Sequence, residues 1–79
     1  MYLERTLNIL SQLQCRTNIY SICVQEIIGF GKFKTVLEGK YISDIKENKD
    51  FSKYKYYYTV EVQFLSGKCC IFITDIKLL

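Results

Sequence analysis

The feature that most constrains this chain of 79 residues is an alternating pattern near its C-terminus, which a Ser-Gly turn divides. Before the turn, every second residue is apolar: Tyr56, Tyr58, Val60, Val62 and Phe64. A period of two residues is typical of a strand with one buried face. Ser66-Gly67 form the turn, and the pattern continues after it at Cys69, Ile71 and Ile73. The sequence therefore predicts a β-hairpin with strands over about 55–65 and 68–76.

Counting outward from this turn predicts which residues face each other. Leu65 lies opposite Lys68, and the next pairs on one face are Phe64 with Cys69, Val62 with Ile71 and Val60 with Ile73. A slip of one residue would turn Ile71 and Ile73 toward solvent, so the burial pattern fixes this register. Because neighbouring side chains on a strand alternate, Cys69 and Cys70 are expected on opposite faces.

The N-terminal segment has the spacing of a helix. Leu3, Leu7 and Leu10 recur at i, i+4 and i+7, with polar residues opposite them, which predicts an amphipathic helix over 2–14. An isolated helix of this length is only marginally stable in water. We therefore expect its apolar stripe to cover a sheet.

The middle of the chain is less regular. Residues 17–28 fit a helix or a strand, and their Ile, Val and Thr content favours a strand over about 19–28. Gly29-Phe30-Gly31 predicts a turn. A long strand over 33–47 follows, with a bulge or bend at Gly39. Residues 48–53 are polar and predict an exposed loop.

These elements predict an α+β fold in a single domain over residues 1–79. The N-terminal helix is followed by an antiparallel β-meander of four or five strands, because no connection is long enough for parallel pairing. The alternatives for this meander are a closed small barrel and an open sheet that the helix covers.

A resemblance to a known family bears on the barrel alternative and leaves the open sheet an equally good account. The runs GKYISDIKEN, YYYTVEVQF, SGK and ITDIKLL resemble the strand order of SH3-like small barrels of the Tudor and KOW type, over residues 33–79. The Gly-centred loop of KOW domains is missing, and an aromatic cage of the Tudor type cannot be assigned to particular residues. The resemblance therefore implies a fold and carries over no functional residue.

Composition argues against catalysis. The chain has 0 histidines, which excludes Ser-His and Cys-His nucleophile pairs and His-ligated metals. Its 8 acidic residues are scattered rather than paired for acid-base chemistry. A chain this short also leaves little volume for a substrate cleft once its core is built. We therefore expect a protein that is not an enzyme and takes no cofactor.

The cysteines and the apolar runs indicate whether the chain binds a metal and in which cellular compartment it lies. Cys15, Cys23, Cys69 and Cys70 lack the two close pairs that structural zinc usually takes, so we expect no metal site. No export signal precedes them, which favours reduced thiols that pack as small apolar groups in a cytoplasmic protein. No apolar run reaches the ~18 residues of a membrane span, so we expect no membrane insertion.

The charge is concentrated in the middle of the chain. Residues 32–58 hold seven lysines against four acidic residues, which accounts for the whole net charge of +3. Lysines interleave with aromatic residues there, and lysines can contact phosphates while exposed rings stack on unpaired bases. Tyr56 and Tyr58 share the apolar face of their strand and are expected to be packed. The predicted binding surface therefore comprises Lys32, Lys34, Lys53, Tyr54, Lys55 and Tyr57.

Two functional hypotheses follow. In the first, a small binding or regulatory protein docks on nucleic acid or a nucleoprotein complex through this Lys/Tyr surface. In the second, a compact inhibitor or adaptor of the kind that viruses and mobile elements encode binds a larger nucleic-acid-processing enzyme. The strand over 68–76 is apolar on both faces, which also predicts a homodimer.

Overall fold

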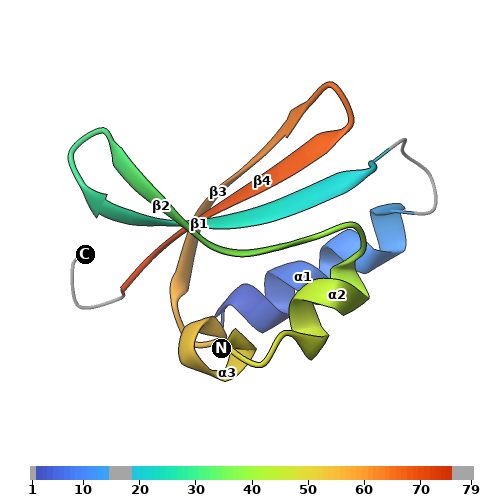
Figure 1. Ribbon diagram of the computed structural model, residues 1–79, viewed down its shortest axis with the longest axis horizontal. Coiled ribbons are helices and arrows are strands. Elements are labelled where there is room, and N and C mark those ends of the chain that lie inside the picture. The colour runs from blue at the N-terminus through green and yellow to red at the C-terminus, as the bar shows by residue number, and fades with distance from the viewer. Residues whose placement is uncertain (1, 15–18, 76–79) are drawn as a thin grey trace.

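The computed structural model describes residues 2–14 and 19–75, which form a two-layer α+β fold. The elements follow the order α1 (Tyr2–Gln14), β1 (Ser21–Gly29), β2 (Lys32–Gly39), α2 (Ile42–Glu47), α3 (Phe51–Tyr54), β3 (Tyr58–Leu65) and β4 (Lys68–Thr74). Figure 1 shows α1 and α2 side by side on the same side of the sheet. The fold class and the helix over 2–14 are confirmed.

The sheet is mixed, with strand order β2-β1-β4-β3 and with β1 parallel to β4 at its centre. Both hairpins are antiparallel, but the expectation of a purely antiparallel meander is wrong. The reason is that α2 and α3 separate the two hairpins, so the second hairpin returns on the far side of β1. Because β2 and β3 each pair with one strand, the sheet is open, so the helix-covered sheet is the alternative that forms and the barrel does not close.

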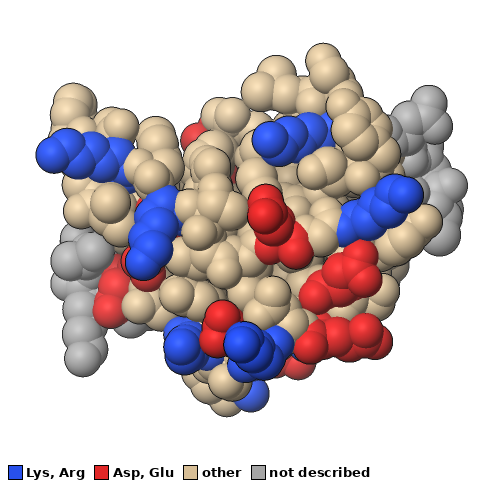
Figure 2. Space-filling model, viewed as in Figure 1, with Lys and Arg blue, Asp and Glu red and all other residues tan. Residues whose placement is uncertain are grey.

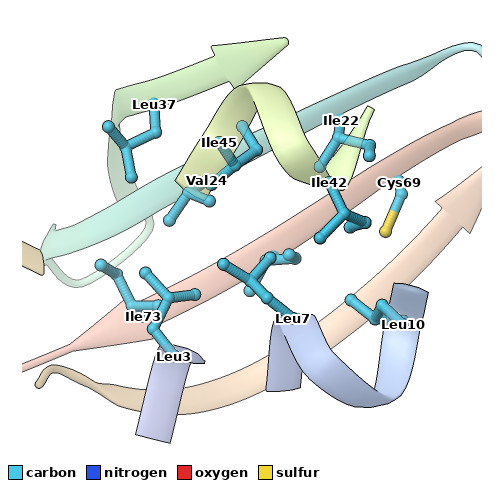
Figure 3. Close-up of a cluster of buried hydrophobic side chains, with 11 residues drawn as sticks. Leu3, Leu7, Leu10, Ile22, Val24, Leu37, Ile42, Ile45, Cys69 and Ile73 are labelled. Atoms are coloured by element: carbon cyan, nitrogen blue, oxygen red, sulfur yellow. The ribbon is translucent and has the colours of Figure 1, made fainter. Parts of the chain in front are cut away.

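The core lies between the sheet and the helices. Leu3 and Leu7 of α1 are fully buried, and Leu10 is nearly so. Figure 3 shows them facing apolar side chains of the two central strands and of α2, in a cluster that includes Ile22, Val24, Ile42, Ile45, Cys69, Ile71 and Ile73. Burial of each leucine or isoleucine contributes roughly 1.5–3 kcal/mol relative to exposure. This cluster therefore holds the helical layer on the sheet.

The ambiguous segment 17–28 forms β1, in agreement with the strand expectation, and residues 17 and 18 lie outside the described residues. Ile22 and Val24 point into the core, whereas Cys23 lies on the other face of the sheet. The β-branched residues occupy a central strand, where they pack beside the side chains of β2 and β4.

The C-terminal hairpin has the predicted turn and most of the predicted register. Ser66 and Gly67 both have positive φ, and Leu65 pairs with Lys68, Phe64 with Cys69 and Val62 with Ile71. Beyond Glu61 a bulge shifts the register, so Ile73 pairs with Thr59 instead of Val60. Thr59 thereby faces α1, where its hydroxyl lies 3.2 Å from that of Thr6. The strands are shorter than expected, and Ile76 lies outside the described residues.

The expected long strand over 33–47 is wrong in its second half. β2 ends at Gly39, and α2 begins at Ile42. The Asp44 carboxylate accepts hydrogen bonds from the backbone N–H groups of Lys40 (3.0 Å) and Tyr41 (2.9 Å), which fixes the start of the helix. Ile42 and Ile45, three positions apart, then both face the core.

The expected exposed loop over 48–53 is also partly wrong, because α3 occupies its C-terminal part. The Asn48 side chain accepts a hydrogen bond from the Asp50 N–H (2.8 Å), in the turn that leads into α3. Phe51 then packs against the core, which anchors this short helix. Since residues 51–54 are helical, the following strand begins at Tyr58 rather than at 55.

Candidate binding surfaces

The six residues of the predicted Lys/Tyr surface lie in two places. Lys32 and Lys34 are exposed on β2, whereas Lys53, Tyr54, Lys55 and Tyr57 belong to α3 and the turn after it. Glu26 of β1 lies between these two places. It is the cross-strand partner of Lys34, and its carboxylate accepts a hydrogen bond from the Tyr57 phenol. The structure thus brings Lys34 toward Tyr57, with an acidic group between them.

The tyrosines of this surface are not exposed as expected. The rings of Tyr54 and Tyr57 lie 5.7 Å apart, and both are half-buried against the core. Tyr56 (62% exposed) and Tyr58 (36%) are the exposed pair, so the expectation is reversed. The physical reason is that α3 interrupts the alternation assumed for a strand beginning at 55.

The surroundings of Tyr57 favour the protonated form of its phenol. Desolvation raises the pKa of Tyr57, and the carboxylate of Glu26, which accepts its hydrogen bond, raises it further. The hydrogen bond to Glu26 holds this half-buried phenol against β1. Tyr57 is therefore a structural contact between the end of α3 and β1.

Charges of both signs alternate over the molecule. Figure 2 shows lysines gathered at the lower edge, where α3 lies, with acidic side chains among and beside them. Lys53 forms an exposed ion pair with Asp50 (3.4 Å), and Lys46 donates to the Asn8 side chain. The Lys55 ammonium lies 4.9 Å from the centre of the Tyr56 ring. This arrangement forms a mixed surface with one exposed Lys–Tyr pair.

The edge strand β3 exposes several large apolar side chains. We call Tyr58, Val60, Phe64 and Leu65 the β3 edge; all four are exposed, and Phe64 and Leu65 exceed half of their full exposure. β3 carries one charged residue, Glu61, and neither Lys nor Pro. β2, the strand at the opposite side of the sheet, carries Lys32, Lys34 and Glu38. Charged side chains protect natural sheet edges against pairing, so the two edges differ.

The sheet face opposite the helices carries a second set of side chains. Ile27, Phe33 and Phe72 line a shallow hollow of about 320 Å³ together with Glu61 and Gln63. The rings of Phe33 and Phe72 lie 5.2 Å apart. Beside them, Cys23 and Cys70 occupy paired positions on β1 and β4. We call this the open face.

The cysteines divide between the two faces. Cys69 is buried in the core (1% exposed), whereas Cys70 is half-buried on the open face, which confirms their opposite orientations. Cys23, Cys69 and Cys70 are all free thiols, and Cys15 lies outside the described residues. The expected packing role therefore holds for Cys69.

Over residues 2–14 and 19–75, no three His, Cys, Asp or Glu side chains gather as metal ligands would. None of the helices in this part of the chain has the length and apolarity to cross a membrane.

No protein-family model, curated protein or solved structure matches this chain. The resemblance to SH3-like barrels of the Tudor and KOW type thus rests on the strand pattern alone and stays a prediction. The surfaces themselves are the basis for a functional proposal.

Proposed function

We propose that the protein is a non-enzymatic binding protein and that its partner is a protein, which adds an extended segment to the β3 edge. The observation that carries this proposal is that one edge strand combines several exposed apolar side chains with a single charged residue. Tyr58, Val60, Phe64 and Leu65 are exposed there, and one charge is present. This is the adaptor or inhibitor hypothesis, now assigned to a particular strand.

The geometry of β3 supports strand addition. A strand with a single neighbour leaves backbone donors and acceptors unpaired along its outer side, and an extended peptide can hydrogen-bond to them. The bulge between Thr59 and Glu61 interrupts only the start of β3, so the regular pairing partner is the stretch 61–65. Such a peptide would carry apolar residues at alternate positions to meet Val62 and Phe64 on the helix side.

Helix α1 extends the same apolar surface. Ile9 and Leu13 of α1 are exposed, and α1 packs beside β3. An incoming strand would therefore add to a surface whose apolar side chains come from α1 as well as from β3. Burial of apolar area, at ~25 cal/mol per Å², supplies affinity in addition to the backbone hydrogen bonds.

Docking on nucleic acid is the second candidate, and the Lys55–Tyr56 pair favours it. Tyr56 is exposed and carries a lysine over its ring, so it offers both a stacking surface and a cation. Lys53 is nearby in the sequence, and Lys32 and Lys34 lie on β2. The acidic residues among these lysines reduce the attraction for phosphates, which places this candidate second.

Selection from a random peptide library tests the first candidate. We expect enriched peptides with alternating apolar residues and a Kd in the micromolar range, about −8 kcal/mol. Phe64→Lys places a charge on the β3 edge and should weaken this binding at least about tenfold, or ~1.4 kcal/mol. Lys53→Glu with Lys55→Glu is the matched control and should leave it unchanged. A failure to enrich any peptide would contradict the proposal.

Fluorescence anisotropy with labelled single- and double-stranded RNA and DNA tests the second candidate. Binding that weakens with salt at a slope of ~0.7 to 0.9 per phosphate contact, and that Lys53→Glu with Lys55→Glu abolishes, would establish nucleic acid as the partner. If this binding occurs and Phe64→Lys leaves all binding unchanged, the Lys/Tyr surface replaces the β3 edge as the docking site.

A further inference from the structure

Two thiols meet at the centre of the open face. Cys23 of β1 and Cys70 of β4 are direct partners in the parallel register, although they lie 47 positions apart in the sequence. The Cys23 thiol donates a hydrogen bond to Cys70 Sγ, and the two sulfur atoms are 3.3 Å apart. The side chains therefore point toward each other across the two central strands.

We propose that Cys23 and Cys70 are a modification site, which a small disulfide such as glutathione disulfide converts to an intramolecular disulfide. This inference goes beyond the binding function and does not depend on it. Neighbouring strands are ~4.8 Å apart, which is within the ~4.4–6.8 Å that separates the Cα atoms of disulfide-bonded cysteines. The sulfur atoms need to approach by little more than an ångström to reach the ~2.05 Å of an S–S bond.

Access favours Cys70 as the first thiol to react. The helices of the described chain lie on the other side of the sheet, so a small reagent reaches this pair from the open face. Cys70 is half-buried, whereas Cys23 is only 4% exposed. Burial raises the pKa of Cys23 to about 11, and the hydrogen bond with Cys70 contributes to this, so Cys23 is a thiol at neutral pH.

The reaction proceeds by two thiol–disulfide exchanges. The Cys70 thiolate, after losing its proton to solvent, attacks one sulfur of glutathione disulfide, and one glutathione leaves as a thiolate. Cys23 then loses its proton and attacks Cys70 Sγ in the mixed disulfide, and the second glutathione leaves. Two protein thiols and one glutathione disulfide thus give one protein disulfide and two molecules of glutathione. The short distance between the sulfur atoms favours the second, intramolecular step.

The new bond would join the two hairpins of the fold. β1 belongs to the first hairpin and β4 to the second, and the sheet connects them only through the β1–β4 pairing. A covalent link at this position constrains the unfolded chain over a long loop, which stabilises the native state. We therefore expect the oxidised protein to unfold at a higher temperature than the reduced protein.

Peptide mapping of the full chain tests the proposal. The reduced protein is incubated with glutathione disulfide, alkylated at the remaining thiols and digested with trypsin. Cys23 and Cys70 lie in the separate tryptic peptides 17–32 and 69–77. The expected product is these two peptides linked, with the loss of two hydrogens. Cys69→Ala should retain the link, and Cys70→Ala should abolish it.

Other products would overturn the inference. A link that survives Cys70→Ala would assign the bond to Cys69 instead. A link from Cys23 or Cys70 to Cys15 would show that Cys23 and Cys70 do not pair with each other. A stable mixed disulfide at Cys70 without any linked peptide would show that the two thiols do not close. Cys69 and Cys70 share one tryptic peptide, so fragmentation of the linked product from the unmodified sequence must locate the alkylated cysteine at position 69 or 70. This readout holds even if a variant fails to fold.

Discussion

Gly39 and Asp44 are so close that a side-chain carbon added to Gly39 would lie 2.5 Å from Cβ of Asp44. This contact marks the point where β2 ends and the chain turns into α2, whose start the Asp44 carboxylate fixes. The glycine is therefore required by the space at this junction, where the chain bends, and of the two predicted uses of Gly39 the bulge within a strand is wrong.

We expect Gly39→Ala to destabilise the protein by about 1–3 kcal/mol, because the backbone must move to relieve the contact. Urea unfolding monitored by circular dichroism measures the change. Gly29→Ala is the matched control, since the nearest atom to an added carbon there lies at 3.6 Å, and it should cost less than ~1 kcal/mol. Equal effects of the two substitutions would contradict this assignment.

The fold could be predicted from the sequence wherever the signal is local. The α1 leucines and the alternation on both sides of Ser66-Gly67 each fall within one element, and both elements are present. α2 was missed because six residues are too few to show a helical period, and Ile42 and Ile45 also fit a strand. The bulge after Thr59 was missed because the contact of Thr59 with Thr6 is a long-range one.

Long-range pairing also limits what could be predicted of the binding surfaces. Nothing local joins β1 to β4, so neither their parallel pairing nor the meeting of Cys23 with Cys70 is visible in the sequence. Lys53 is exposed as expected and Lys55 is half-buried. Tyr54 and Tyr57 were assigned to the wrong environment because α3 changes the side on which they lie.

Shortening a buried side chain of α1 tests the packing of the core. Leu7→Ala removes a fully buried side chain of α1 and should cost about 2–5 kcal/mol in the free energy of unfolding. Ile9→Ala, on the exposed side of the same helix, should cost less than ~1 kcal/mol. Denaturant unfolding of the two variants gives both values. A larger loss for Ile9→Ala would contradict the described orientation of α1, in which Leu7 faces the core.

Alkaline pH should destabilise the reduced protein. Burial raises the pKa of Cys23 and Cys69 to about 11, from an ordinary value of 9.0. Between these values the unfolded chain loses these protons and the folded chain keeps them, so stability falls as pH rises from about 9 to about 11. Urea unfolding in a phosphine reductant at pH 8 and pH 10.5 measures the fall.

The raised pKa of Tyr57 also contributes to the alkaline destabilisation, so a variant provides the control for the thiols. Cys69→Ala removes one of the two buried thiols, and the difference in its stability between the two pH values should be smaller than that of the unmodified protein. An unchanged difference would show that Cys69 does not contribute to the alkaline destabilisation.

Charge reversal on α3 should affect binding to phosphates without affecting the fold. The Lys53–Asp50 ion pair is solvent-exposed, and such pairs contribute about 0–1 kcal/mol. Lys53→Glu should therefore change the free energy of unfolding by less than ~1 kcal/mol, as measured in urea. A larger loss would mean that α3 depends on this pair rather than on the packing of Phe51.

The most direct test of the proposed function is to map where a selected peptide binds. Titration of the isotope-labelled protein with the most strongly enriched library peptide, followed by NMR of the backbone amides, locates the contact residue by residue. The proposal predicts the largest shifts at Val62, Phe64 and Leu65 of β3, and little change at Lys32 and Lys34 on the opposite edge of the sheet. Shifts that cluster on α3 or on the open face, with β3 unchanged, would contradict it.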